Sequence, residues 1–271
     1  MINVLLSGCN GTMGNEVTKQ IQLYPNLCLS CGFDISTNDS KSFPIYNKIE
    51  NISSPVDIII DFSAPSLSLN ILEFAMKNSI PIVIATTGFS NKEEEIIIKA
   101  SEIIPVFLSP NMSLNISLMS KIAGELATVL KDTDIEIIET HHHNKKDAPS
   151  GTALLLADSI NKKLNNSMIY TFGRHNITEK RTKNEIGFSS IRGGNIVGEH
   201  TIKFFGSNET FEITHVSYSR SIYADGALKA AKFLINKTAG LYNMDNLVRE
   251  KGNHFWSEPQ KCPFFWGFTI F

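Results

Sequence analysis

The segment Val4–Gly14, VLLSGCNGTMG, decides the fold of the first part of the chain. Its apolar start predicts a short buried strand at Val4–Ser7, and Thr12–Leu23 predicts the helix that follows. Three glycines spaced three residues apart allow a tight turn between them and let backbone N–H groups approach a ligand. This pattern is typical of a loop that binds the pyrophosphate of a dinucleotide at a helix N-terminus. The alternative is an ordinary turn between a strand and a helix.

An acidic residue after the loop, Asp34, supports nucleotide binding there. Asp34 ends the next predicted strand, Leu27–Asp34, twenty residues after Gly14, where a carboxylate can accept hydrogen bonds from ribose hydroxyls. A carboxylate repels a 2′-phosphate and no Arg follows it, so the residues favour NADH over NADPH. Asp34 could instead be a solvated acid at a strand end. The loop residues expected to hold the cofactor are Gly8, Cys9, Asn10, Gly11, Thr12 and Met13. Glycine is commoner at the position of Asn10, but Asn also tolerates positive φ.

Strands and helices continue to alternate as far as Leu108. The predicted strands are Asp57–Phe62, Pro81–Thr86 and Pro105–Leu108, and the predicted helices are Ser66–Asn78 and Asn91–Ser101. This alternation predicts an α/β fold with a Rossmann-type, doubly wound parallel sheet. Ligands of such sheets bind at the carboxyl ends of strands, so a nicotinamide ring is expected beside two strand ends, although either could be an ordinary loop. The residues concerned are Ala85, Thr86, Thr87, Ser109, Pro110, Asn111 and Met112.

The pattern changes after Asn111 and predicts a second, α+β domain with an open antiparallel or mixed sheet. Its predicted elements are helices Leu114–Leu130 and Thr152–Leu164 and strands Ile135–Glu139, Glu185–Arg192, His200–Phe205 and Thr210–His215. Arg192–Asn195, RGGN, is typical of a turn between two of these strands. A helix at Ala224–Asn236 has a face of small residues suited to packing on the first domain.

The predicted domains are therefore a dinucleotide-binding domain, residues 1–112 plus 221–250, and an inserted substrate-binding and oligomerisation domain, residues 113–220. Residues 251–271 carry aromatic residues without periodicity and predict an irregular extension. The extension could cover a groove or a partner subunit, or could have no function.

The composition excludes several classes of protein. The chain has 271 residues and a formal net charge of −2, so no basic surplus indicates a nucleic-acid partner. No apolar run approaches ~18 residues, so no membrane span is expected, and the start does not resemble a signal peptide. We expect a cytoplasmic protein. Cys28 and Cys31 fit two thiols on opposite faces of a strand better than a redox or metal pair.

The run Glu139–Thr152, ETHHHNKKDAPSGT, carries the candidate chemistry. His141 can transfer a proton near neutral pH, and the neighbouring cations should lower its pKa. Lys145 supplies positive charge for a developing negative one, and the helix start at Gly151 and Thr152 offers N–H groups and a hydroxyl to a carboxylate. Consecutive histidines on a strand alternate faces, so we expect no metal site. A second alternative is a basic solvated loop before a helix that Ser150 caps.

The longer run Glu136–Ala153 resembles the signature of the 4-hydroxy-tetrahydrodipicolinate reductase (dihydrodipicolinate reductase) family. The resemblance also covers the glycine loop and spans about 250 residues, and its other segments are DFS at 61–63, ATTGF at 85–89, SPNMS at 109–113, IVGEHT at 196–201 and EITH with SR within 212–220.

The resemblance implies that NADH or NADPH reduces a cyclic hydroxy-imine dicarboxylate to tetrahydrodipicolinate, with loss of water, in the diaminopimelate route to lysine. It implies that His141 handles the ring proton, that Lys145 donates near the ring nitrogen, and that His142, Gly151 and Thr152 hold the substrate. It also implies a homotetramer formed through the sheets of the second domain. Thr12 and Ile35 stand where the family often has basic residues, which again favours NADH.

The sequence leaves two other functions open. A different NAD(P)-dependent dehydrogenase, such as one acting on an amino-acid semialdehyde, would leave the histidine run unexplained. A non-catalytic nucleotide sensor would need neither Lys145 nor the carboxylate site. Binding of pyridine-2,6-dicarboxylate, a planar mimic of the substrate, separates a reductase from a sensor.

Overall fold

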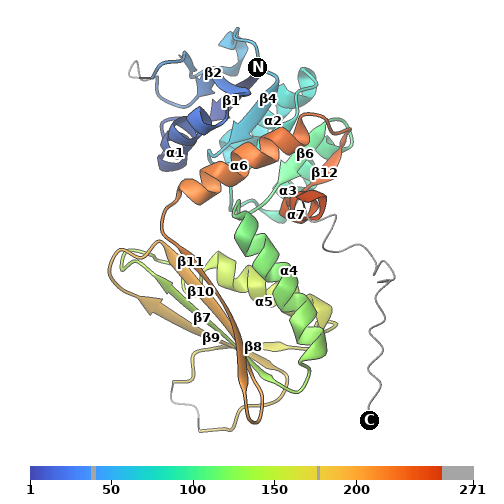
Figure 1. The fold of residues 1–271 in the computed structure, drawn as a ribbon. Helices are drawn as coiled ribbons and strands as arrows, with labels where there is room; N and C mark the ends of the chain where they lie inside the picture. The colour runs from blue at the N-terminus through green and yellow to red at the C-terminus, as the bar shows by residue number, and fades with distance from the viewer. Residues whose placement is uncertain (38–40, 176–177, 252–271) are drawn as a thin grey trace, which may run out of the picture.

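The computed structural model describes residues 1–37, 41–175 and 178–251 and places them in two stacked domains (Figure 1). The first contains a seven-stranded sheet in the order β12-β6-β5-β4-β1-β2-β3, with every neighbouring pair parallel. The strands are β1 (Ile2–Ser7), β2 (Leu27–Phe33), β3 (Ile45–Tyr46), β4 (Ile58–Asp61), β5 (Ile82–Ile84), β6 (Pro105–Leu108) and β12 (Gly240–Tyr242). This confirms the predicted doubly wound parallel sheet.

Helices cover both faces of this sheet. They are α1 (Thr12–Gln20), α2 (Pro65–Lys77), α3 (Asn91–Ser101), α6 (Ser221–Leu234) and α7 (Met244–Lys251), with short 3-10 turns at Ile21–Leu23 and Ile49–Asn51. Side chains of the central strands alternate between the faces: Val4 and Leu6 pack in the cluster with α1 and α6, and Leu5 packs in the cluster with α2 and α3. Continuous apolar strands are what a sheet buried on both faces requires.

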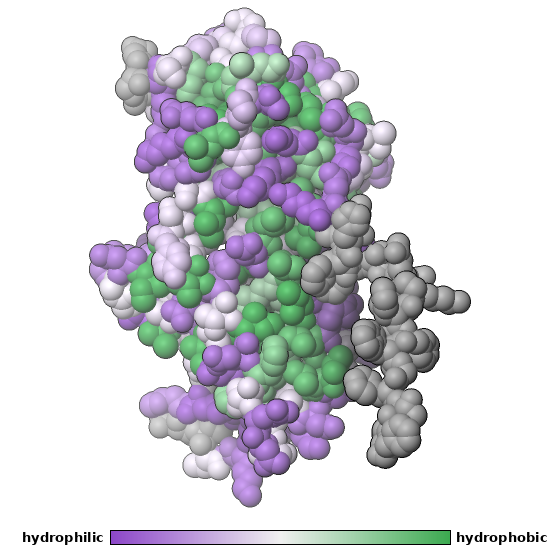
Figure 2. Space-filling view, viewed as in Figure 1, coloured by the Kyte–Doolittle hydropathy of each residue, from purple (hydrophilic) through white to green (hydrophobic). Residues whose placement is uncertain are grey.

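The second domain has a five-stranded mixed sheet in the order β11-β10-β7-β9-β8. Its strands are β7 (Asp134–His141), β8 (Ile169–Phe172), β9 (Glu185–Arg192), β10 (Gly198–Phe205) and β11 (Thr210–Ser217), and its helices are α4 (Leu114–Val129) and α5 (Gly151–Lys163). Both helices lie on one face, where Ile137, Ile202 and Phe204 are buried. Figure 2 shows an apolar surface over α4 in this view, where Leu118 and Val129 are 38% and 78% exposed.

The predicted turn at Arg192–Asn195 is confirmed, with Gly194 and Asn195 in a turn between two strands. The segment joins β9 to β10, but these strands do not pair, because β7 lies between them. The connection passes over the end of β7: Gly193 N–H donates to the carbonyl of His141, and His142 N–H donates to the carbonyl of Ile196. The candidate run is therefore held at the centre of the sheet.

The chain crosses between the domains twice, at 109–113 and at 218–220. The first crossing is pressed against α6, because a Cβ added to Gly226 would lie 1.7 Å from the carbonyl oxygen of Met112. The hydroxyl of Ser117 on α4 donates to Asp245 on α7 at 2.9 Å, which adds a contact between the domains. Residues 252–271, most of the predicted extension, lie outside the described residues.

Three of the four cysteines lie in the described part of the chain, and all three are free. Cys28 and Cys31 both lie on β2, as predicted. Within the described residues, every helix is too short or too polar to cross a membrane.

Candidate active site

A cavity of about 380 Å³ lies where the two domains meet. It brings together eight of the residues that the sequence singled out: Thr87, Pro110, Asn111, His141, His142, Lys145, Gly151 and Thr152. Its other lining residues are Ser150, Leu155, Val197, Arg220 and Tyr223. Strand ends of the first sheet supply one wall, and the ETHHH run with the start of α5 supplies the other.

The first turn of α5 forms a carboxylate-binding arrangement. Ser150 caps the helix by accepting from Ala153 N–H at 3.2 Å, and Gly151 and Thr152 follow at the wall of the cavity. N–H groups of a first helical turn have no partner within the helix, and the helix dipole adds positive potential there. The side-chain amide of Asn111 donates to the hydroxyl of Thr152 at 2.9 Å, so the two domains meet at this point.

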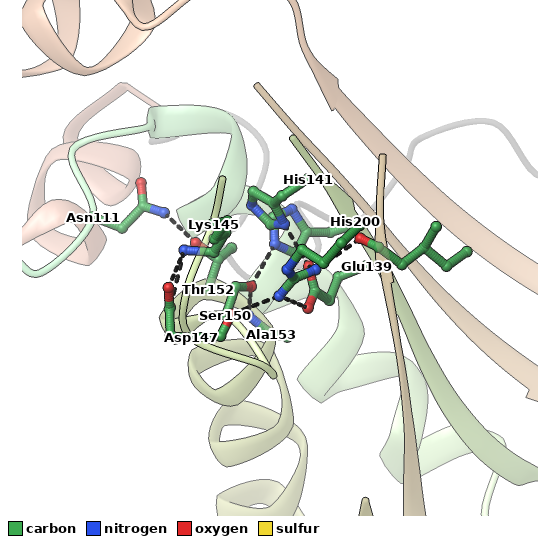
Figure 3. A network of polar contacts seen from close by, with 11 residues as sticks. Asn111, Glu139, His141, Lys145, Asp147, Ser150, Thr152, Ala153 and His200 are labelled. Atoms are coloured by element: carbon green, nitrogen blue, oxygen red, sulfur yellow. Dashed lines mark hydrogen bonds and ion pairs between the residues drawn. The ribbon is translucent and has the colours of Figure 1, made fainter. Parts of the chain in front are cut away.

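His141 ends β7 and is buried beside Glu139, which contacts its Nδ1 (Figure 3). The two side chains share a face because strand residues two apart point the same way. Arg192, opposite His141 on β9, donates to both oxygens of Glu139, at 2.9 and 2.7 Å. The pKa of His141 lies below its usual value, as predicted, but burial is the largest cause; Glu139 opposes the shift, and Lys145 and Arg192 add to it.

Lys145 follows in the loop after β7, with its ammonium group 2.8 and 2.9 Å from the oxygens of Asp147. Burial is the largest single cause and raises the pKa of Asp147, but the hydrogen bonds that Asp147 accepts from Lys145 and from the backbone, together with the charges of Lys145 and Arg192, outweigh it, so the pKa lies below its usual value. The charge of Lys145 is thus already paired, which the sequence reasoning did not anticipate. Asp147 is exposed, so a substrate anion can compete with it for Lys145.

His200 on β10 lies behind His141, with their rings edge to face and their centroids 5.1 Å apart. Its Nε2 is 3.0 Å from the hydroxyl oxygen of Ser150. Because that oxygen already accepts from Ala153 N–H, its own proton is available to His200 Nε2. The pKa of His200 is lowered to about 3. Burial is the largest cause, and the charge of His141 is the next largest. His200 is therefore neutral at physiological pH.

Glu139, His141 and His200 also have a spacing that could hold a metal ion. The donor set fits a metal poorly, because Arg192 already neutralises Glu139 and donates to both of its oxygens. His143 points elsewhere: its Nδ1 is 2.9 Å from the carbonyl oxygen of Gly194 and its side chain is exposed. No reaction step is assigned to a metal.

The glycine loop between β1 and α1 fits a dinucleotide. Gly8 has φ +75°, and a Cβ there would lie 2.6 Å from the carbonyl oxygen of Phe62, so only glycine fits. Gly11 caps α1 without a side-chain hydrogen bond, which leaves first-turn N–H groups for a phosphate. Asp34 accepts from the N–H of Asn10 at 2.9 Å. Asn10 does not have the positive φ considered for it; its amide instead donates to the carbonyl of Ser36 at 2.8 Å.

Other predicted cofactor residues differ in what they can offer. The side chains of Cys9 and Met112 are buried in the apolar core, so only their backbones can reach a ligand. Thr86 donates its hydroxyl to the buried carboxylate of Asp61 at 2.8 Å, which leaves Thr87 at the cavity. Ser109 donates to the carbonyl of Asn111 at 2.8 Å. The remaining predicted residues, Gly8, Gly11, Thr12, Met13 and Ala85, lie on the same edge of the sheet.

Sequence reasoning missed five residues of this site: Glu139, Arg192, His200, Arg220 and Tyr223. Glu139 carried a usable signal, since it lies two residues before His141 on a predicted strand. Arg192 and His200 could not be placed without the strand order, which sets both β9 and β10 beside β7.

A parallel doubly wound sheet, a second mixed sheet and a polar cavity between them are the features of a two-domain, nicotinamide-dependent oxidoreductase. The family models for the N-terminus and the C-terminus of dihydrodipicolinate reductase match residues 2–112 and 115–248. The chain therefore belongs to the dihydrodipicolinate reductase family, which confirms the resemblance drawn from the sequence.

Individual relatives of this chain support the same family. The chain is 46% identical over 250 residues to the 4-hydroxy-tetrahydrodipicolinate reductase of Caldanaerobacter subterraneus subsp. tengcongensis, covering 92% of this chain and 99% of the relative. It is 40% identical over 252 residues to that of Clostridium novyi, covering 93% and 100%. The solved structure of a dipicolinate-bound dihydrodipicolinate reductase from Paenisporosarcina sp. TG-14 is similar with a TM-score of 0.76 at 25% identity, covering 91% and 99% of the two chains.

Proposed function

We propose that this protein reduces 4-hydroxy-tetrahydrodipicolinate to tetrahydrodipicolinate with NADH or NADPH, with loss of water, in diaminopimelate and lysine biosynthesis. The observation that carries the proposal is the cavity in which His141, Lys145 and the start of α5 face the cofactor edge of the first sheet. The similarity to relatives named 4-hydroxy-tetrahydrodipicolinate reductase extends over nearly their whole length. The solved structure of a similar reductase contains the planar dicarboxylate dipicolinate. The rival dehydrogenase and the nucleotide sensor have no comparable support.

In the proposed reaction, different residues bind the substrate, stabilise its charge and transfer the proton. Gly151 and Thr152 hold one substrate carboxylate with N–H groups and a hydroxyl at the N-terminus of α5. Lys145 and His142 add donors, and Lys145 stabilises negative charge near the ring nitrogen. His141 holds or delivers the ring proton. The bound nicotinamide supplies hydride, so hydride and one proton enter while the hydroxyl leaves as water.

The test follows oxidation of NADH with freshly made hydroxy-tetrahydrodipicolinate. His141→Gln and Lys145→Ala should each lower kcat by about 10²-fold or more, the range for loss of a general acid or an electrostatic donor, with NADH binding nearly unchanged. The matched controls are His143→Gln and Lys146→Ala, which change the same residue types in the same run and should retain turnover. Unimpaired turnover of both site variants would remove these roles, and failure to bind dipicolinate would remove the substrate site.

The cofactor preference is proposed as NADH over NADPH, with both used. Asp34 at the expected ribose position repels a 2′-phosphate, and Thr12 and Ile35 supply no cation. One cation that the sequence reading overlooked lies nearby: the ammonium of Lys41 is 2.6 Å from the side-chain oxygen of Asn15 on α1. We expect Lys41→Ala to raise the KM for NADPH and to leave the KM for NADH unchanged. Equal changes for both cofactors would contradict a 2′-phosphate contact.

The assembly is proposed as a homotetramer formed through the second sheet, in the cytoplasm. The face of β7, β9 and β11 opposite α4 and α5 carries apolar residues, with Ile191 50% and Val216 38% exposed, and Ile138 lies on the same face of β7, one row along from them. Free thiols are compatible with a reducing compartment. Ile138→Arg should shift the sedimentation of the protein toward smaller species, whereas Val129→Arg on α4 should not. A wild-type monomer would contradict this assembly.

A further inference from the structure

Glu139 is a buried carboxylate to which neither the sequence reading nor the proposed mechanism gives a role. Only 1% of its surface is exposed; Arg192 contacts both of its oxygens, and His141 contacts one of them. It contacts His141 Nδ1 on its own strand (Figure 3). It also accepts hydrogen bonds from both terminal nitrogens of Arg192 on the neighbouring strand. Burial would raise the pKa of Glu139, but the hydrogen bonds from Arg192, Ser190 and His141 outweigh it, so the pKa lies below its usual value. Glu139 is therefore an anion inside the protein.

This anion determines how the imidazole of His141 is oriented. An ionised carboxylate only accepts, so the ring nitrogen that faces it, Nδ1, carries a proton. The other nitrogen, Nε2, then exchanges the reactive proton, and His141 lines the cavity. The ring of His200 packs edge to face against the imidazole, which limits its freedom to turn. The backbone of Gly198 also lies close to Nε2, so close that an added Cβ would come within 3.1 Å of it.

Arg192 holds Glu139 in turn. Besides its two bonds to the carboxylate, it donates to the carbonyl of Asp147 at 2.6 Å, which ties the loop that carries Lys145 to the same group. The pairing of β7 with β9 sets Arg192 directly opposite His141. One guanidinium thus fixes both the partner of His141 and the backbone beside Lys145.

We propose that Glu139, held by Arg192, is a positioning residue that fixes His141 with its proton on Nδ1 and presents Nε2 to the substrate. The inference rests on the proposed function, since the proton in question is the one delivered to the reduced ring. When His141 gives up the Nε2 proton, the bond from Nε2 to hydrogen breaks, the substrate atom gains that hydrogen, and a neutral imidazole remains with Nδ1–H toward Glu139.

Charged and titratable groups face His141 from every element around it. They are Glu139 from β7, Lys145 from the following loop, Arg192 from β9 and His200 from β10. Two further groups lie behind these: Asp147 pairs with Lys145, and His215 on β11 lies beside His200. Of these, Glu139 is the one that raises the pKa of His141 by direct contact. Removing its charge should therefore shift to lower pH the limb of the activity profile that reports protonated His141.

The test is a double-mutant cycle on turnover with hydroxy-tetrahydrodipicolinate. Glu139→Gln should lower kcat by about 10²-fold, with the KM for NADH unchanged, and should lower it no further in a His141→Gln background, because Glu139 acts through His141. Glu136→Gln is the matched control: it lies on the same strand, points to the other face and pairs with Arg181. It should retain wild-type turnover and pH profile.

A second measurement does not depend on turnover. The ¹⁵N shifts of the His141 imidazole should show the Nδ1–H form in wild type and a mixture of tautomers in Glu139→Gln. If wild type turns over no substrate but shows the Nδ1–H form, the proposed function fails and the positioning stands. An equal loss from Glu139→Gln with and without His141, or an unchanged tautomer, overturns the proposal. Should Glu139→Gln fail to fold, Arg192→Lys, expected to lower kcat less and shift the pH profile in the same direction, replaces it.

Discussion

The buried imidazole of His200 makes the stability of this protein depend on pH in a way that can be calculated. The pKa of His200 is about 3 in the folded protein, against 6.5 for an ordinary histidine, and burial is the largest cause. Because the folded pKa is depressed, the unfolded chain binds the proton more tightly. Stability is therefore lost as the pH falls below 6.5, and the loss levels off only near pH 3.

Each unit of pKa difference corresponds to about 1.4 kcal/mol, so the drop from pH 7 to pH 5 should cost about 2 kcal/mol through His200 alone. The assay is urea unfolding of wild type and His200→Gln at both pH values and at one protein concentration. The variant will be less stable at pH 7, since its packing changes, but its loss between the two pH values should be smaller by about 2 kcal/mol. His141 and His215, whose pKa values are also lowered, contribute in both proteins. An equal loss in wild type and variant would refute the burial argument.

Three further substitutions test the packing of α6 on the first crossing between the domains, the proposed carboxylate site at the start of α5, and the nucleotide loop. Gly226→Ala should lower the free energy of unfolding by about 3 kcal/mol, because its Cβ would overlap the carbonyl of Met112; an unchanged urea midpoint would contradict this. Thr152→Val removes the hydroxyl that accepts from Asn111 and should raise the KM for substrate about tenfold, with NADH binding as the control that stays constant. Gly8→Ala should abolish NADH binding measured by calorimetry, since φ +75° and the contact with Phe62 exclude a side chain, and retained affinity would show that the loop adapts.

The sequence predicted the sheet of the first domain because its strands are continuous apolar runs, such as Ile58–Asp61, between recognisable helices. It missed the eight-residue helix α7. The strands that it missed are short or lie at an edge: β3 has two residues, β12 has three, and β8 has two half-buried and two exposed residues. Such strands bury too little apolar surface to leave a periodic signal. Their position depends on the neighbouring strand rather than on their own residues.

The residues of the candidate site also fall into two groups, those that the sequence revealed and those that depend on the fold. His141, Lys145 and Thr152 are contiguous in the sequence, so one run revealed them together. The pairing of Glu139 with Arg192 and the contact of His141 with His200 arise from strand order and register, which place residues from β9 and β10 on either side of β7. Charge crowding was a correct reason for a low pKa of His141, but burial, which the sequence did not show, is the larger cause.

The strand β7 has a consequence for how this family can change over time. Its inward residues, Glu139 and His141, carry the proposed chemistry, while the alternate residues Ile138 and Thr140 face the uncovered side of the sheet. Each face can accept substitutions without disturbing the other, so the proposed assembly and the proposed reaction can diverge independently. A single inserted or deleted residue would exchange the two faces and destroy both at once. The length of this strand should therefore be more constrained than its composition.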